Sequence, residues 1–312
     1  MHRGVQMVPT IKQLTYLVAL DDYRHFGKAA ASCFISQSAF SIAIKELETT
    51  LNVHLVDRTN KSVNITEAGK AVIRQARLCI SDVQALMNIA TSGQEPLSGR
   101  LTLGVIPTIA PFLLPSFMPE SLSRFPKLQL YLREDKTMVI HEQLLEGKLD
   151  LILFALPFQM MGVTVMPLFE DPFLLACSQG SKWVSGAHDE SGFDALADES
   201  IMLLEDGHCL RDHALSACSV RNSDQVSRFA ATSLPTLLQM VVADLGVTFI
   251  PEMARDSLMG SEAELELHTM PRQSYREIGL AWRKGSSRSE EFMLLGELLK
   301  ALHRRTAVTE LD

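Results

Sequence analysis

The chain has 312 residues, of which 46% are hydrophobic and 21% charged, which is typical of a globular protein with two or three domains. No apolar run reaches the ~18 residues of a membrane helix, and the first residues lack the apolar core of a secretion signal. We therefore expect a cytoplasmic protein without a membrane partner. The net charge of −8 argues against a simple nucleic-acid binder. However, residues 1–99 carry 10 Lys and Arg against 8 Asp and Glu, a slightly basic head on an acidic body.

The first three helices are predicted from apolar spacing and capping residues. They span residues 10–22, 26–34 and 36–51, and Thr10 and Ser36 can cap the first and third. The apolar side of the third helix is expected to consist of Ile35, Ala39, Ile42 and Leu47. Two short helices in close succession, the first rich in alanine, form a helix-turn-helix pattern.

The next elements are a hairpin and a long helix. Residues 54–66 alternate in polarity around the turn at 60–62, which predicts a β-hairpin wing with Arg58 and Lys61 near its tip. A helix from Glu67 to about Ala90 is expected to be a linker and dimerisation element, the alternative being that it packs on its own domain. The Gly, Pro and Ser of the following residues predict a hinge.

From residue 100 onward, strand-like and helix-like segments alternate, which predicts an α/β fold with largely parallel sheets. The length of this region suits two α/β subdomains with a cleft between them. The predicted domains are a winged helix-turn-helix at 10–67, a linker helix at 68–92, a hinge at 93–99 and an α/β domain at 100–312. Within the last, subdomain I takes about 100–170 and 276–304, and subdomain II takes about 171–275.

The five cysteines show no C-x-x-C pair and no Cys/His cluster with zinc-finger spacing. An odd, sparse set in a cytoplasmic protein indicates reduced thiols, most of them apolar core residues. We therefore expect neither a metal nor a cofactor.

Residues 26–69 resemble the winged helix-turn-helix of the LysR-type transcriptional regulators. They contain A-A, S-Q-x-x-x-S-x-x-I-K-x-L-E, L-x-x-x-L-x-x-R and T-x-A-G at fixed spacings, with Ser38 where that family usually has proline. The rest of the chain is similar to the OxyR group of hydrogen-peroxide sensors within this family. That similarity covers residues 104–115, 125–134, 147–156, 203–218, 231–241 and 276–286. It implies a periplasmic-binding-protein-like arrangement of the two subdomains.

The resemblance places the third helix in the major groove of double-stranded DNA. Gln37 can pair with an adenine edge and serine with either kind of base, whereas Lys45 is better suited to phosphate. The wing residues Arg58 and Lys61 are expected to contact the DNA backbone or minor groove. The predicted DNA-binding residues are Ser36, Gln37, Ser38, Ser41, Lys45, Arg58 and Lys61.

The resemblance also implies a redox pair, Cys209 as the peroxide-reactive thiol and Cys218 as the resolving thiol. Nine helical residues span about 13.5 Å, whereas a disulfide needs Cα atoms within ~7 Å. If 206–218 is helical, the bond therefore requires unwinding. The residues implied to shape the peroxide pocket are Thr108, Thr137, His208 and Arg276, with Arg276 as the cation that favours the thiolate.

The resemblance further implies a homodimer or homotetramer that contacts RNA polymerase, with a cellular thiol reductant resetting the disulfide. The alternative within the family is a regulator that binds a small metabolite in the cleft. A thiol peroxidase and a solute-binding protein are two further hypotheses. The predicted DNA-binding domain argues against both. The chain has no P-loop, G-x-G-x-x-G, H-E-x-x-H or G-x-S-x-G motif, so we expect no enzyme.

Overall fold

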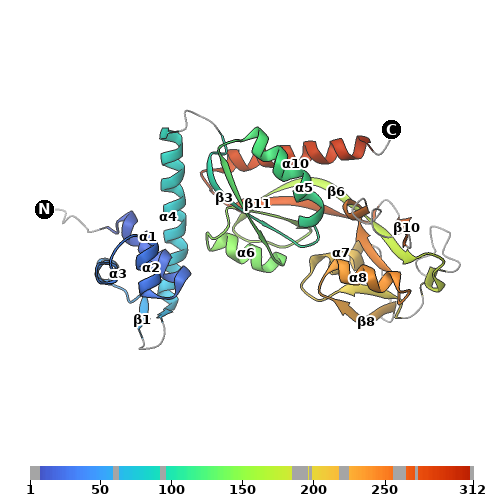
Figure 1. The fold of residues 1–312 in the computed structure, drawn as a ribbon, viewed down its shortest axis with the longest axis horizontal. Coiled ribbons are helices and arrows are strands. Elements are labelled where there is room, and N and C mark those ends of the chain that lie inside the picture. Colours follow the sequence, from blue (N-terminus) through green and yellow to red (C-terminus); the bar gives the residue numbers. More distant parts are fainter. Residues whose placement is uncertain are drawn as a thin grey trace. The chain divides into compact units, whose positions relative to one another are not determined.

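The computed structural model describes residues 8–58, 63–91, 96–184, 196, 199–217, 225–255, 265–270 and 273–309 (Figure 1). The chain divides into two compact units, which we call the first unit (residues 1–95 and 145–148) and the second unit (residues 96–144 and 149–312). Within the described ranges, no helix has the length and apolar character needed to cross a membrane.

The first unit has three helices, a two-stranded hairpin and a long fourth helix. The bounds are α1 Ile11–Tyr23, α2 Phe26–Ser32, α3 Gln37–Leu51, β1 Val56–Arg58, β2 Val63–Ile65 and α4 Glu67–Thr91. Thr10 and Gln13 form a capping box at the start of α1, and the Ser36 hydroxyl accepts a hydrogen bond from the backbone N–H of Ala39 at the start of α3. The turn of the wing, with Lys61, lies outside the described residues.

The predicted apolar side of α3 is confirmed at Leu47 and Ile35, which pack in the same core, and wrong at Ala39 and Ile42. The buried residues are Phe40, Ile44 and Leu47, whereas Ile42 is 59% exposed and Ala39 is also exposed. Residues 40, 44 and 47 follow helical spacing and lie on one face. Position 42 is about 200° from position 40 around the helix, so it points to the opposite side.

The start of α4 is tied closely to the base of the wing. The Thr66 hydroxyl accepts from the backbone N–H of Gly69 (2.9 Å) and donates to the carbonyl of His54 (2.8 Å). A Cβ at position 69 would lie 2.3 Å from the carbonyl oxygen of Leu55. A carboxylate oxygen of Glu48 in α3 accepts a hydrogen bond from the backbone N–H of Leu55 (2.8 Å). Leu55, the residue before β1, is therefore in contact with both α3 and the start of α4.

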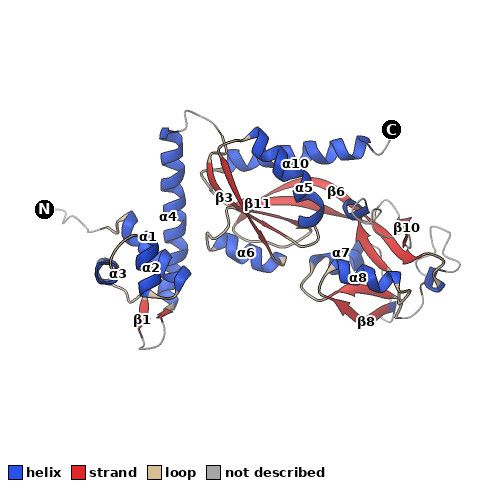
Figure 2. Cartoon of the chain, in the orientation of Figure 1, coloured by secondary structure: helices blue, strands red, loops and turns tan. Residues whose placement is uncertain are grey.

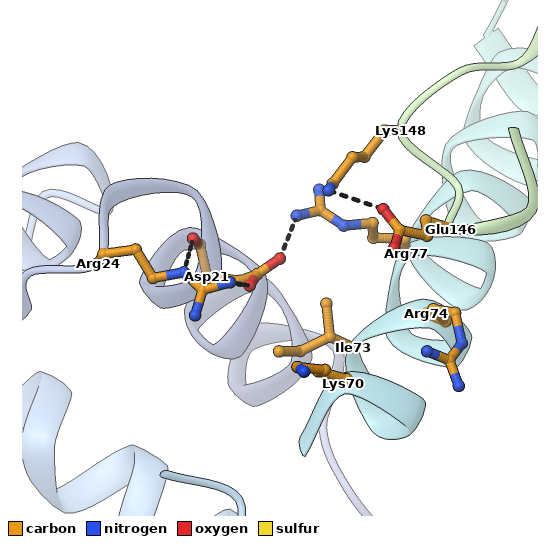
Figure 3. A pocket seen from close by; sticks show the side chains of 8 residues that line it. All are labelled: Asp21, Arg24, Lys70, Ile73, Arg74, Arg77, Glu146 and Lys148. Atoms are coloured by element: carbon orange, nitrogen blue, oxygen red, sulfur yellow. Dashed lines mark hydrogen bonds and ion pairs between the residues drawn. The ribbon is translucent and has the colours of Figure 1, made fainter. Parts of the chain in front are cut away.

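Ion pairs join α1 to α4. Arg77 contacts Asp21 (3.0 Å) and Asp22 (2.5 Å), and Asp21 also pairs with Arg24 (2.5 Å). Figure 3 shows Asp21 between Arg24 and Arg77, with Lys148 paired to Glu146. A hollow of about 210 Å³ is lined by Asp21, Arg24, Lys70, Ile73, Arg74, Arg77, Glu146 and Lys148. These contacts fix α4 to the helix-turn-helix.

The second unit contains a seven-stranded sheet in the order β10-β6-β11-β5-β3-β4, with β9 paired to β6. The bounds are β3 Gly99–Val105, β4 Leu128–Glu134, β5 Leu151–Leu156, β6 Val163–Ser178, β9 Thr248–Pro251, β10 Leu265–Thr269 and β11 Tyr275–Arg283. A separate parallel pair is formed by β7 (Ile201–Leu204) and β8 (Val226–Ala231).

The expectation of largely parallel sheets is wrong. Only β3–β4 and β3–β5 are parallel in the large sheet, and the pairs made by β6 and β11 are antiparallel. β11, late in the chain, runs antiparallel between β5 and β6, and the long β6 pairs with β11 along its first part and with β9 and β10 along its second. This arrangement depends on pairing between distant strands, which local alternation does not reveal.

In the described part of the second unit, the helices are α5 Ala110–Arg124, α6 Thr137–Leu145, α7 Cys209–Ala217, α8 Leu234–Val242 and α10 Ser289–Thr309, with short 3-10 turns at Lys182–Val184 and Glu252–Ala254. From β3 the chain moves to β4 in one direction through α5, then back past β3 to β5 through α6. Because such crossovers are right-handed, α5 and α6 must cover opposite faces of the sheet, as Figure 2 shows.

The second unit has two hydrophobic cores. The first includes β3, β5, β11 and the inner sides of α5, α6 and α10, and the second surrounds the end of β6 with β7, β9 and α8. The helix α7 contributes to both, because Cys209 packs in the first core whereas Leu210 and Ala214 pack in the second. The helix α7 therefore contacts both cores of the second unit.

Candidate sensor site and DNA-binding surface

Cys209 is a buried free thiol at the first residue of α7. Its residue is 8% exposed. Burial raises the pKa of the thiol, while the hydroxyl of Thr137 and the positive charge of Arg276 act in the opposite direction. The start of a helix also favours a negative charge. The site thus holds groups that stabilise a thiolate, but burial outweighs them in this conformation.

Arg276 is held by a buried network at the start of β11. Its side chain is fully buried, and its Nε donates to a carboxylate oxygen of Asp171 (2.9 Å). Its two terminal nitrogens donate to the hydroxyl (2.9 Å) and the carbonyl (2.8 Å) of Thr108. Thr108 lies in the turn between β3 and α5, as expected. Asp171 is the direct cross-strand partner of Arg276 between β6 and β11, and the sequence reasoning missed it.

Thr137 begins α6 and is buried beside the Cys209 sulfur. Among the described residues its Oγ1 has no hydrogen bond of normal length and angle, so its approach to the sulfur is weaker than a full hydrogen bond. An unpaired buried hydroxyl next to a thiol is able to bind a small polar ligand.

His208 precedes Cys209 and is 7% exposed. Burial, and next the charge of Lys136, lower the pKa of its imidazole, which keeps the ring neutral at neutral pH. Lys136 was not predicted, although it adjoins Thr137. Its Nζ donates to the carbonyl of Asp206 (3.2 Å), which links the segment after β4 to the residues before α7.

His213, one turn after Cys209 in α7, is a second residue that the sequence reasoning missed. Its Nε2 lies 3.0 Å from the carbonyl oxygen of Pro157, and its Nδ1 is buried without a hydrogen-bond partner in the described part of the chain. Burial lowers the pKa of this ring. The i, i+4 spacing from Cys209 was the signal that could have identified it. A hollow of about 550 Å³ beside it is lined by Leu156, Pro157, His213, Ser216, Gln273, Tyr275 and Glu277.

The structure therefore brings Thr137 and Arg276 to Cys209, with Thr108 bound to Arg276 and His208 adjacent in the chain. Cys218 lies outside the described residues.

Most of the predicted DNA-binding residues lie at the start of α3. Gln37, Ser38 and Lys45 are exposed and Ser41 is partly buried. Ser36 caps the helix, and its hydroxyl is 3.0 Å from that of Ser38. Arg58 ends β1, but its side chain, like all of Lys61, lies outside the described residues.

One exposed aromatic was not foreseen. Phe34, in the turn before α3, is 95% exposed with a φ of 57°, and it lies close to the start of the helix that carries the predicted DNA-binding residues. A large apolar residue in the short connection between α2 and α3 was the available signal.

Comparison with known proteins agrees with this geometry. Residues 11–70 match the bacterial regulatory helix-turn-helix protein, lysR family, and residues 94–304 match the LysR substrate binding domain. The chain is 38% identical to the HTH-type transcriptional regulator EstR of Acinetobacter baylyi, covering 95% of this chain and 97% of the relative. It is also 38% identical to the hydrogen peroxide-inducible genes activator of Escherichia coli, covering 93% and 95%.

Among solved structures, a full-length OxyR variant from Pseudomonas aeruginosa matches with a TM-score of 0.79 and 31% identity, covering 94% of this chain and 95% of that one. The two family matches together span both units, and the structural match extends over nearly the whole chain. The chain belongs to the LysR family of transcriptional regulators and is OxyR-like within it.

Proposed function

We propose that this regulator senses hydrogen peroxide by oxidation of Cys209, followed by a disulfide with Cys218. The observation that carries the proposal is the position of Cys209, a free thiol beside Thr137 and Arg276 at the junction of two hydrophobic cores. The E. coli relative named for peroxide-inducible genes supports the choice of oxidant.

The chemistry needs only the thiolate and its surrounding donors. The Cys209 thiolate attacks one oxygen of the peroxide, the O–O bond breaks, and the leaving hydroxide takes a proton to become water. Thr137 and Thr108 can donate to the peroxide oxygens, while Arg276 stabilises the charge. The Cys218 thiolate then attacks the sulfur of the sulfenic acid, which forms the disulfide and displaces hydroxide, and this hydroxide takes up a proton to become a second water.

The disulfide requires α7 to unwind. The helix runs from Cys209 to Ala217, so their Cα atoms are about 12 Å apart. Because Cys218 is bonded to Ala217 and consecutive Cα atoms are 3.8 Å apart, an intact α7 keeps the pair beyond about 8 Å, outside the ~7 Å limit of a disulfide. Gly207, at a φ of +88°, offers a pivot before the helix. Unwinding would withdraw Leu210 and Ala214 from the second core, which couples oxidation to the whole regulatory region.

The test is a brief stoichiometric peroxide pulse on the reduced protein, followed by mass spectrometry of the thiols. We expect loss of two thiols in the wild type, a sulfenic acid in Cys218→Ser, and no rapid reaction in Cys209→Ser. Since burial raises the thiol pKa above its ordinary 9.0, the thiolate fraction and hence the rate should rise about tenfold per pH unit through neutral pH. A Cys209→Ser protein that still responds to peroxide would exclude the mechanism and favour the metabolite-binding alternative.

For the DNA-binding function we propose that Gln37 reads a base edge whereas Lys45 contacts phosphate. Gln37→Ala should weaken binding to the specific operator by about 1–3 kcal/mol and leave non-specific binding nearly unchanged. Lys45→Ala is the matched control, because it should weaken both and reduce the salt dependence. Titration of both variants against operator and random duplexes measures this. Equal loss on both duplexes for Gln37→Ala would mean that it reads no base.

The proposal includes an assembly. Leu86 and Met87 of α4 are 66% and 52% exposed, which suits burial against a second copy, and a tetramer would form as a dimer of dimers. Oxidation would change the packing of the copies, the spacing of DNA contacts and thereby contact with RNA polymerase. A cellular thiol reductant would restore the reduced form. The protein would act in the cytoplasm as a switch of transcription and not as an enzyme. Its domains would have the bounds predicted from the sequence.

A further inference from the structure

The pairing of β6 with β10 gathers three potential metal ligands in the second unit. Cys177 is the cross-strand partner of Glu266, and Leu175 is the partner of His268. Side chains two residues apart on a strand share a face, so Cys177, Glu266 and His268 point to the same side of the sheet.

The separations of the donor atoms fit a single small cation. Sγ of Cys177 lies 3.4 Å from Nε2 of His268, which lies 3.7 Å from Oε2 of Glu266. All three donor atoms lie within 4.8 Å of one another. In a tetrahedral zinc site, bonds of about 2.3 Å to sulfur and 2.0–2.1 Å to nitrogen or oxygen give donor–donor separations of about 3.3–3.6 Å. The separations of 3.4 Å and 3.7 Å lie close to these values, and rotation of the partly exposed Glu266 side chain would complete the site.

The site is closed at its base and open at its mouth. Cys177 is fully buried, whereas the side chains of His268 and Glu266 are 32% and 45% exposed. A cation can therefore reach the thiol past two partly exposed ligands, and a fourth coordination position faces solvent.

We propose that Cys177, His268 and Glu266 bind a zinc-type divalent cation, with water in the fourth position. On binding, the Cys177 thiol gives up its proton to solvent and becomes the thiolate ligand. One thiolate, one imidazole and one carboxylate favour Zn²⁺ or Co²⁺ over Mg²⁺ and Ca²⁺, which prefer oxygen ligands. The ion would fasten the edge strand β10 to β6, in a place separate from the cysteine proposed to sense peroxide.

The hydrogen-bond explanation is the competing one, in which the thiol and imidazole interact without a metal. The test is titration of the reduced full-length protein with Co²⁺, followed by displacement with Zn²⁺. We expect one equivalent per chain, with a thiolate-to-cobalt charge-transfer band in the near ultraviolet that disappears on addition of Zn²⁺. Zn²⁺ should also protect Cys177 from alkylation, as measured by peptide mass spectrometry.

The variants separate this site from other thiols. His268→Gln changes a partly exposed position that should fold normally, and it should weaken Zn²⁺ binding by at least tenfold. Cys177→Ala should abolish the charge-transfer band, whereas Cys79→Ser and Cys209→Ser should retain it. The proposal is overturned if no band forms at saturating Co²⁺, if His268→Gln binds as tightly as the wild type, or if the band depends on Cys209 instead.

Discussion

Asp171→Ala is expected to destabilise the second unit by about 3–5 kcal/mol, because it leaves the fully buried Arg276 without its counter-ion. Asp171 also accepts from the backbone N–H of Met253 (3.1 Å), so the change removes two interactions at once. At about 2–4 °C per kcal/mol for a domain of this size, the melting temperature should fall by on the order of 10 °C. Thermal or denaturant unfolding of the reduced protein measures this.

A double-mutant cycle is the control. Arg276→Met alone should also be costly, because it leaves Asp171 buried and unpaired. Asp171→Ala combined with Arg276→Met should lose much less than the sum of the two single changes, because neither charge then remains buried alone. Additive losses, or an Asp171→Ala protein with an unchanged melting temperature, would show that the pair is not coupled in this way.

Gly69→Ala should destabilise the first unit by about 3 kcal/mol and abolish specific DNA binding. The added Cβ would lie 2.3 Å from the carbonyl oxygen of Leu55 and 2.7 Å from a methyl carbon of Ile65. Because the Leu55 oxygen belongs to the backbone and cannot rotate away as a side chain could, α4 must move away from the base of the wing. The wing would then no longer hold its position relative to α3.

Gly27→Ala is the matched control within the same unit. It also adds a methyl group in a helix, but the nearest atoms are side-chain atoms of His25 and Gln37 at 3.1–3.3 Å, which can move. Its melting temperature should change far less, and helix propensity favours alanine. Thermal unfolding of both variants compares them, and a Gly69→Ala protein as stable as Gly27→Ala would refute the close approach of α4 to the wing.

The helix-turn-helix was predictable because its signals are local. Thr10 and Ser36 cap their helices as expected, and the bounds of α1 and α3 agree with the prediction to within one residue. Ala39 and Ile42, predicted for the apolar face of α3, are exposed because they lie off the face that carries Leu47. The face is instead set by Phe40 and its neighbours at helical spacing.

The sheet was only partly predictable. β3, β5 and the core of β11 are recognisable as buried apolar runs, whereas β8 and β10 contain no such run, because most of their residues are partly or fully exposed. The first part of β6 contains Pro167 and Pro172, and because proline is rare inside strands, the sequence does not indicate a strand there. β11 pairs antiparallel with β5 and β6, whose paired residues lie more than 100 positions earlier in the chain, so no local pattern predicts this pairing.

The amino-acid sequence by itself determined the family, the presence of a helix-turn-helix region and an α/β region, and the choice of Cys209 as the candidate redox residue. Contiguous motifs carry all three. Only the tertiary structure paired Arg276 with Asp171, placed α7 between two cores, and gathered Cys177 with Glu266 and His268. Asp171 and Arg276 are 105 residues apart in the chain, and Cys177 precedes Glu266 and His268 by 89 and 91 residues. Their proximity arises from strand register, which is set by the burial of whole sheet faces and not by any short run of residues.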